Sequence, residues 1–403
     1  MWSSREGWRR TVGALLLVLG TAGLAVAQPA APPPGQDAKS AKSLNGLLRS
    51  DLSLEGRTVT LAVDPALRAA DPSHRRFFSP DGSPDARARL GHLVIAGAVR
   101  IGALDVPAAN PAGQQFDVWI ETTADGWGLE IADARAPESP KVIGDVVLDR
   151  KRLGGGARAT LLAALIPATE NTGRLVLQWG EFEAAADLLF TDPVARRPPA
   201  APPNTLVNRR HDEDTTAVSR VIMLSQRSET ALVTPKGARF SVTFARSFKK
   251  GRTNAATAAT GVTSSLGLGV DGRDFAKLMS TSSGAVVELS ESGAPRLSIS
   301  SPVRFGKALL RPGNQGPGYP GAYGMWLKRV GTGWRLVFNN EPDAWGTQHD
   351  PKLDAGEIPL TYSKDGAPER PFGVALVPSA ADRGRLVIIW GPHEWSTDFT
   401  IGG

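Results

Sequence analysis

The chain has 403 residues, no cysteine and a formal net charge of +6. The absence of cysteine excludes disulfide frameworks, thiolate catalysis and thiolate metal sites, so stability has to come from buried apolar surface. The charge is small for a chain of this length and gives no support to a nucleic-acid or other polyanionic partner.

The N-terminus has the features of a secretory signal peptide. Arg5, Arg9 and Arg10 precede an apolar run over residues 12–26, which closes with small residues before Gln28. This run is shorter than the roughly 20 residues that span a bilayer, and no comparable run follows. We therefore expect cleavage after this run, export to the periplasm or the extracellular space, and no transmembrane anchor in the mature chain. The paired arginines leave twin-arginine export open beside the general secretory route.

Two proline-rich stretches divide the rest of the chain. Prolines favour an extended backbone, and both stretches offer little apolar surface to bury, so we expect a disordered tether and a linker. The predicted organisation is a signal peptide at 1–27, the tether at 28–43, a first domain at 44–191, the linker at 192–219 and a second domain at 220–403.

The elements predicted along the chain are mostly strands. Residues 58–63 and 239–244 alternate polar with apolar side chains, which is the pattern of a strand with one buried face. Residues 274–279 favour a short helical turn, and residues 296–300 a further strand. Residues 326–338 predict a hairpin, because glycines near their centre permit the positive φ of a tight turn.

The two halves of the chain match each other in sequence and in spacing. The matching segments are 99–102 with 303–306, 119–129 with 326–336, 164–167 with 375–378, and 173–180 with 384–391. Such self-similarity indicates a duplicated structural unit. Because its segments are short strands with glycine- and proline-rich turns, we predict an all-β fold of two tandem β-sandwich-like domains. The shared tryptophans should pack in the core or between the sheets: Trp119, Trp127, Trp179, Trp326, Trp334 and Trp390.

The second half resembles the DUF2911 family of exported bacterial proteins, for which a β-sandwich is predicted. The resemblance covers most of residues 228–403, and its segments are SFKKGR at 247–252, the hairpin at 321–334, the asparagine pair at 339–340, WGTQHD at 345–350 and the strand at 385–390. The chain departs from the family at 271–291, where the usual tryptophan-arginine-x-glycine-alanine-asparagine stretch is missing. The first half is linked to the family only by its match to the second half of the chain, and it has no equivalent of residues 345–350.

Residues that occur in only one copy are the candidates for a function beyond the fold. Aromatic rings could stack on sugar rings while amides and carboxylates bond the hydroxyls, so we predict a ligand-binding surface in the second copy. Its candidate residues are Trp345, Trp395, Tyr319, Tyr323, Asp343 and Gln348. The alternative for the two tyrosines is that they pin the glycine-rich loop at 313–324.

Two histidine-carboxylate pairs are candidate metal ligands: His349 with Asp350, and His393 with Glu394. Imidazole and carboxylate groups can bind a catalytic metal ion. Neighbouring residues of a strand point to opposite faces, however, so each pair would have to lie in a loop to face one ion. The alternative is that the histidines are turn or surface residues.

Other catalytic signatures are absent from the sequence. No Gly-x-Ser-x-Gly nucleophile motif occurs, and strand residues rather than a helix follow the glycine-rich loop, which argues against a phosphate cradle. We therefore favour a non-catalytic binding module of the cell envelope, without a cofactor, whose partner is an envelope glycan such as peptidoglycan or an envelope protein. The alternatives are a metal-assisted hydrolase with its site in the second repeat, and a structural protein of an envelope assembly.

Overall fold

The structure is a computed structural model in which the compact unit Ala41–Gly403 contains every described residue. The described residues are 43–54, 56–78, 86–107, 113–123, 126–135, 141–153, 156–169, 171–191, 227–245, 279–289, 294–313, 321–342, 349–364, 370 and 372–402. Antiparallel strands dominate, so the predicted all-β class is confirmed. No helix in this part of the chain is both long and apolar enough to cross a membrane.

Each half of the chain contributes one set of strands. The first set is β1 (Leu48–Leu54), β2 (Arg57–Val63), β3 (Arg87–Ala96), β4 (Val99–Ile101), β5 (Leu104–Val106), β6 (Gln114–Thr123), β7 (Gly126–Asp133), β8 (Val142–Arg152), β9 (Arg158–Pro167), β10 (Thr172–Gly180) and β11 (Phe182–Phe190), with a short 3-10 helix, η1 (Pro72–Phe78). The second set is β12 (Arg227–Val233), β13 (Arg239–Ala245), β14 (Val286–Glu288), β15 (Arg296–Ile299), β16 (Val303–Phe305), β17 (Ala308–Leu310), β18 (Ala322–Val330), β19 (Gly333–Asn339), β20 (Asp354–Ser363), β21 (Gly373–Ala380), β22 (Arg383–Trp390) and β23 (His393–Ile401), with a second 3-10 helix, η3 (Pro351–Leu353).

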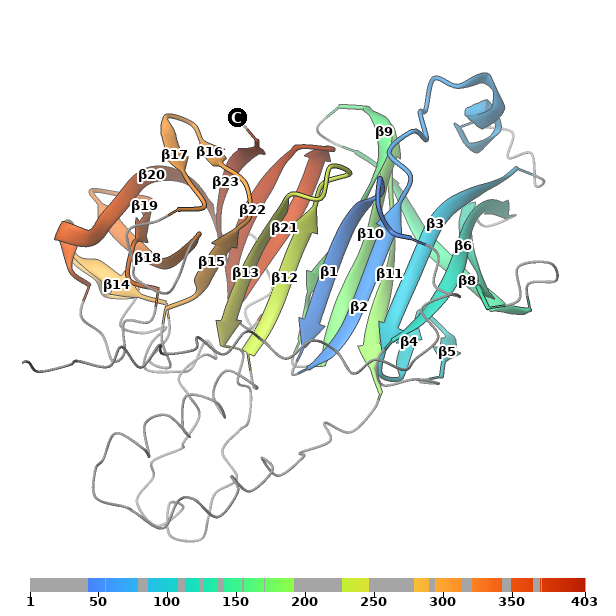
Figure 1. Cartoon of the computed structure of the whole chain (residues 1–403), viewed down its shortest axis with the longest axis horizontal. Coiled ribbons are helices and arrows are strands. Elements are labelled where there is room, and N and C mark those ends of the chain that lie inside the picture. The colour runs from blue at the N-terminus through green and yellow to red at the C-terminus, as the bar shows by residue number, and fades with distance from the viewer. Residues whose placement is uncertain are drawn as a thin grey trace, which may run out of the picture. The chain divides into compact units, whose positions relative to one another are not determined.

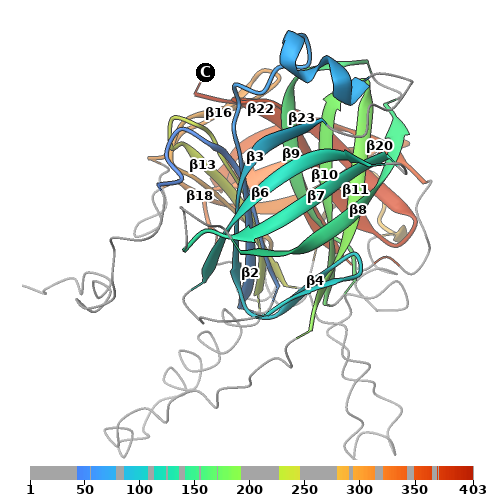
Figure 2. The ribbon, with the colours of Figure 1, turned by 90° about the vertical axis from the view of Figure 1, so that its right-hand side faces the viewer.

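The strands of the first repeat form two layers. One layer has the order β1-β2-β3-β6-β7-β8. The other has the order β9-β10-β11, which β4 and β5 extend. Strand β8 joins the layers, because its first part pairs with β7 and its end pairs with β11. In Figure 2 the layer of β6, β7 and β8 lies across that of β9, β10 and β11.

The second repeat pairs its strands in the same way. Its first layer runs β12-β13-β15-β18-β19-β20, and its second layer runs β21-β22-β23 with β16 and β17. Strand β20 changes layers as β8 does, from β19 to β23. The prediction of two tandem β-sandwich-like units is therefore confirmed.

The two repeats join through their first strands. Strand β1 pairs with β12 in an antiparallel ladder centred on Asp51 and Ala231, so the first layers of both repeats form one sheet (Figure 1). Beside this ladder, Arg239 of β13 lies 2.8 Å from Asp51 of β1 and 3.1 Å from Glu229 of β12. In the second layer β9 lies beside β21, where Ile166 packs against the buried Ala375. Both layers are thus continued across the junction.

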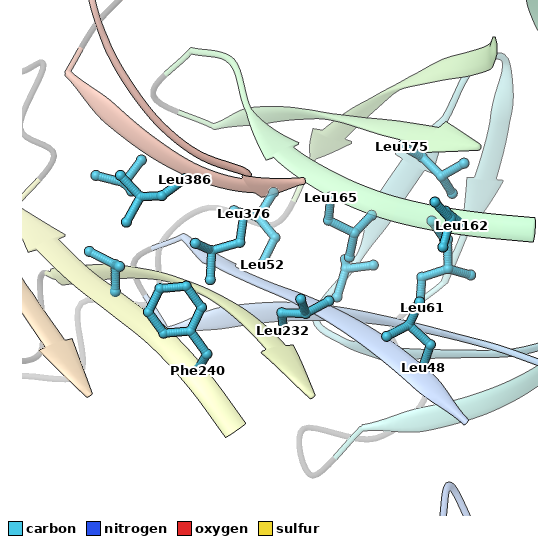
Figure 3. Packing of buried hydrophobic residues seen from close by; sticks show 14 of the residues in the cluster. Leu48, Leu52, Leu61, Leu162, Leu165, Leu175, Leu232, Phe240, Leu376 and Leu386 are labelled. Atoms are coloured by element: carbon cyan, nitrogen blue, oxygen red, sulfur yellow. The ribbon is translucent and has the colours of Figure 1, made fainter. Parts of the chain in front are cut away.

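The hydrophobic core also continues across the junction. Figure 3 shows leucines of β1 and β12 facing leucines of β9 and β21, among them Leu52, Leu232, Leu165 and Leu376. All four side chains are buried, and they belong to a single apolar cluster that extends through both repeats. Ser50, at the centre of the same junction, accepts a hydrogen bond from the backbone N–H of Leu165 at 2.9 Å. The junction is therefore packed like the interior of one domain.

Candidate functional site

His349 lies at a corner between β19 and β20. Its Nε2 is 2.7 Å from Oδ1 of Asp354, and its ring packs beside Trp326 with 5.5 Å between the ring centroids. The buried amide of Asn339 donates a hydrogen bond of 3.0 Å to the same carboxylate oxygen. These contacts hold the chain that enters β20 against the end of β19.

Asp350 takes part in the same corner. Its backbone carbonyl accepts a hydrogen bond of 2.9 Å from the Asn339 side chain. Its carboxylate accepts one of 2.9 Å from the backbone N–H of Lys352, which caps the short helix η3. A side chain that caps a helix in this way satisfies a backbone donor that would otherwise lack a partner. Both residues thus have a clear role in shaping the corner.

His393 begins β23 and is only 5% exposed. Its Nδ1 lies 2.6 Å from the Tyr362 hydroxyl, and its ring stacks on those of Tyr362 and Trp395. Burial lowers the pKa of His393, and the nearby Lys364 lowers this pKa further. Because both effects disfavour the imidazolium form, His393 is neutral at physiological pH.

The two candidate metal-binding histidines lie at opposite ends of β20. His349 contacts Asp354, the first residue of this strand, and His393 contacts Tyr362, near its last residue. Eight residues of extended chain separate these two contacts by about 26 Å. Glu394 lies 3.7 Å from Arg370. Within the described ranges, no group of three His, Cys, Asp or Glu side chains is arranged to hold a metal ion.

Two of the aromatic candidates are buried. Trp395 is 0% exposed and packs edge-on against Trp334. Tyr323 is 3% exposed, and its hydroxyl donates a hydrogen bond of 2.5 Å to the backbone carbonyl of Arg311. Burial raises the pKa of Tyr323. Neither ring presents a face to solvent, and Tyr323 ties the chain after β17 to β18. Most of the loop that the tyrosines were expected to pin lies outside the described residues, so that interpretation stays a prediction.

The other candidates of the predicted ligand-binding surface lie outside the described residues. They are Trp345, Tyr319, Asp343 and Gln348.

A cleft of about 620 Å³ lies at the junction of the two repeats. Its floor is apolar and buried, and both repeats contribute to it: Leu48 at the start of β1, Leu161 and Leu162 on β9, and Ile401 at the end of β23. This volume falls within the range of sites for small organic ligands, which occur preferentially where two domains meet.

Hairpin turns form the mouth of the cleft. The turn between β12 and β13 contributes Lys236, and the turn between β21 and β22 contributes Asp382. Both side chains are exposed, unlike those of the floor. Backbone hydrogen bonds join the walls, from Ile401 to the carbonyl of Asp382 at 2.7 Å and from Leu161 to that of Leu67 at 2.8 Å. The cleft is therefore set in regular, hydrogen-bonded structure.

None of the cleft residues was among the sequence candidates. They come from parts of the chain far apart in sequence, and the contacts between the repeats, β1 with β12 and β9 with β21, bring them together. One sequence signal for the cleft is a difference between the first hairpins of the two copies. The turn of this hairpin consists of residues 234–238 in the second copy and of residues 55–56 in the first.

Comparison of the chain with family models, with curated proteins and with solved structures found no match. The resemblance to the DUF2911 family therefore stays a prediction, and the candidate function rests on the geometry of the chain itself.

Proposed function

We propose that this protein is an exported, non-catalytic binding protein that holds a small, largely apolar ligand in the cleft between its two repeats. The observation that carries the proposal is the cleft itself. Its size suits a small organic molecule, its floor is apolar, and a few polar groups surround its mouth, which is the usual composition of such sites.

The chemistry of the lining favours an apolar molecule over a glycan. Sugar recognition relies on exposed aromatic rings, and the described lining contains none. The hydroxyls of Thr160 and Ser301 provide polar contacts beside the leucine floor. The signal-peptide features at the N-terminus support a location in the periplasm or outside the cell.

The test is thermal unfolding of the mature chain against a panel of small apolar and amphipathic molecules. A ligand that binds only the folded state at a hundred times its Kd stabilises that state by about 2.7 kcal/mol, so a cleft ligand should raise the midpoint measurably. Ala381→Trp, in the turn at the mouth, should fill the cleft and abolish the rise.

Ser379→Trp is the matched control, because Ser379 is an exposed neighbour that does not line the cleft. This variant should keep the response of the wild type. Equal stabilisation of the wild type and of Ala381→Trp would place the ligand elsewhere and overturn the proposal, as would a panel without any stabilising molecule.

A further inference from the structure

We propose that the ligand of the cleft is a single-chain amphiphile with an anionic head group, whose apolar chain lies on the apolar lining and whose head binds Lys236. The inference rests on the proposed function and adds the chemical class of the ligand.

The lining sets the requirement for an apolar chain. The apolar lining that a ligand can reach is half-buried and includes Pro65, Pro235, Ala380 and Ala381, above the buried Leu48 and Ile401. Burying apolar surface of a ligand against these side chains is favourable by roughly 25 cal/mol per Å². A polar ligand body would lose its hydration over these apolar groups and would find few hydrogen-bond partners besides the hydroxyls of Thr160 and Ser301. The lining therefore selects hydrocarbon.

The charges at the mouth favour an anion. Lys236 has no ion pair with any residue that the structure describes. The other charged lining residue, Asp382, already lies 3.6 Å from the guanidinium of Arg383. Among the described residues of the mouth, the carboxylate of Asp382 thus lies near a cation, and the charge without an ion pair is the positive one, on Lys236.

The turn that carries Lys236 is held in a defined conformation. Gly237 donates a backbone hydrogen bond of 2.9 Å to the carbonyl of Thr234, which closes a β-turn with Pro235 and Lys236 at its centre. The Thr234 hydroxyl accepts a second bond, of 3.1 Å, from the backbone N–H of Ala238. Proline at the second position of a turn fixes its backbone. The base of the lysine side chain is therefore fixed, while its long aliphatic part can follow the ligand.

This turn is also a difference between the two copies. Five residues, 234–238, connect β12 to β13, whereas two residues, 55–56, connect β1 to β2. A feature shared by both copies serves the common fold, but a longer turn in one copy, placed at the mouth of the cleft, fits a role in binding.

The experiment compares probes that share one chain and differ in the head group. Decanoate, decanol and decyltrimethylammonium are titrated below their aggregation limits into the mature chain by calorimetry, and acetate provides the head without the chain. The wild type should bind decanoate most tightly and acetate not measurably. Raising the salt concentration should weaken only decanoate, because salt screens the ion pair.

Lys236→Glu should weaken decanoate binding about tenfold and change decanol binding by less than about twofold, because the substitution replaces an attraction by a repulsion. Lys307→Glu is the control, since Lys307 is an exposed lysine of the β16–β17 turn and does not line the cleft. Because both lysines are exposed, each unliganded variant should unfold at the wild-type midpoint.

The outcomes separate this inference from the proposed function. If decanol and decanoate bind equally and Lys236→Glu changes neither, the anionic head group is wrong while the apolar cleft stands. If acetate binds as tightly as decanoate, the chain is irrelevant and the amphiphile is wrong. If no probe binds, or if Ala381→Trp leaves all binding unchanged, the proposed function fails as well.

Discussion

Leu52→Ala tests whether the two repeats unfold as one unit. Leu52 is 0% exposed and pairs with Val59 of its own repeat and with Thr230 of the other. It packs so closely on β10 that a Cβ added to Gly173 would lie 2.6 Å from its Cδ2. Removing such a side chain leaves a cavity and lowers the free energy of unfolding by about 2–5 kcal/mol.

The expected shift in midpoint depends on the size of the cooperative unit. If residues Ala41–Gly403 unfold together, a loss of about 3 kcal/mol lowers the midpoint by about 4 °C. If the first repeat unfolds alone, the same loss is divided by a smaller unfolding entropy and lowers its midpoint by about 10 °C. Because the core and one sheet cross the junction, we expect the smaller shift in a single transition.

Differential scanning calorimetry measures the shift in midpoint and the number of transitions. The ratio of calorimetric to van 't Hoff enthalpy reports whether a transition is two-state. Leu353→Ala, which removes an exposed leucine, is the control and should change the free energy of unfolding by less than about 0.5 kcal/mol. Two separate transitions, of which Leu52→Ala moves only one, would refute the shared core as the source of cooperativity.

Three further predictions concern individual side chains. Burial lowers the pKa of His393 below its ordinary value of 6.5, so the unfolded chain binds the proton more readily than the folded chain does, and the free energy of unfolding falls as the pH drops below 6.5 through the lowered pKa. His393→Phe should remove this loss in denaturant titrations between pH 7 and about pH 5. If the free energy of unfolding of the variant depends on pH as that of the wild type does, the prediction is wrong. Asn339→Ala leaves two hydrogen bonds of the corner at 349–354 unmade and should lower the free energy of unfolding by about 1–3 kcal/mol, whereas a neutral result would mean that the corner does not depend on this amide. Gly91→Ala would put a Cβ 2.0 Å from a backbone carbonyl oxygen of the adjacent strand and should lower the free energy of unfolding by about 1–3 kcal/mol. Gly56→Ala is its control, because Gly56 also has a positive φ but has open space around it. Equal losses of stability in both variants would attribute the effect to backbone conformation alone.

The local pattern of the sequence predicted much of the fold. The hairpin expected at 326–338 is formed by β18 and β19 and turns at Gly331, whose φ is +58°. The strands expected at 58–63 and 239–244 correspond to β2 and β13. These predictions succeed because alternation and turn glycines are properties of neighbouring residues. The helical turn expected at 274–279 falls almost entirely outside the described residues, and the predicted domain boundaries stay predictions.

The shared tryptophans illustrate where pattern is insufficient. Five of the six are buried, in agreement with the expectation of packing. Trp119 is only half-buried, on the outer face of β6, where the guanidinium of Arg87 lies 4.3 Å above its ring. Its counterpart Trp326 is buried on the same face, between Ala294 and Val337. Alternation identifies which residues share a face, but it does not state what covers that face.

The candidate site could not be predicted for a similar reason. The candidates predicted from the sequence were reactive side chains, among them His349 and His393, which the fold uses at two distant corners of the second repeat. At the position of His393 the first repeat has Phe182, paired with Trp179 as His393 is with Trp390. The cleft depends instead on the pairing of two strands from different repeats, and strand pairing between distant segments leaves no periodic signal in the sequence.

Strands β1 and β12 would each be the outermost strand of a sheet if the repeats were separated. An outermost strand exposes a row of unpaired N–H and C=O groups, which invites pairing with other chains and aggregation. In this protein each strand closes the open edge of the other repeat. Duplication within one chain thereby removes two such edges from solvent, and a fragment that ends before β12 would regain one of them.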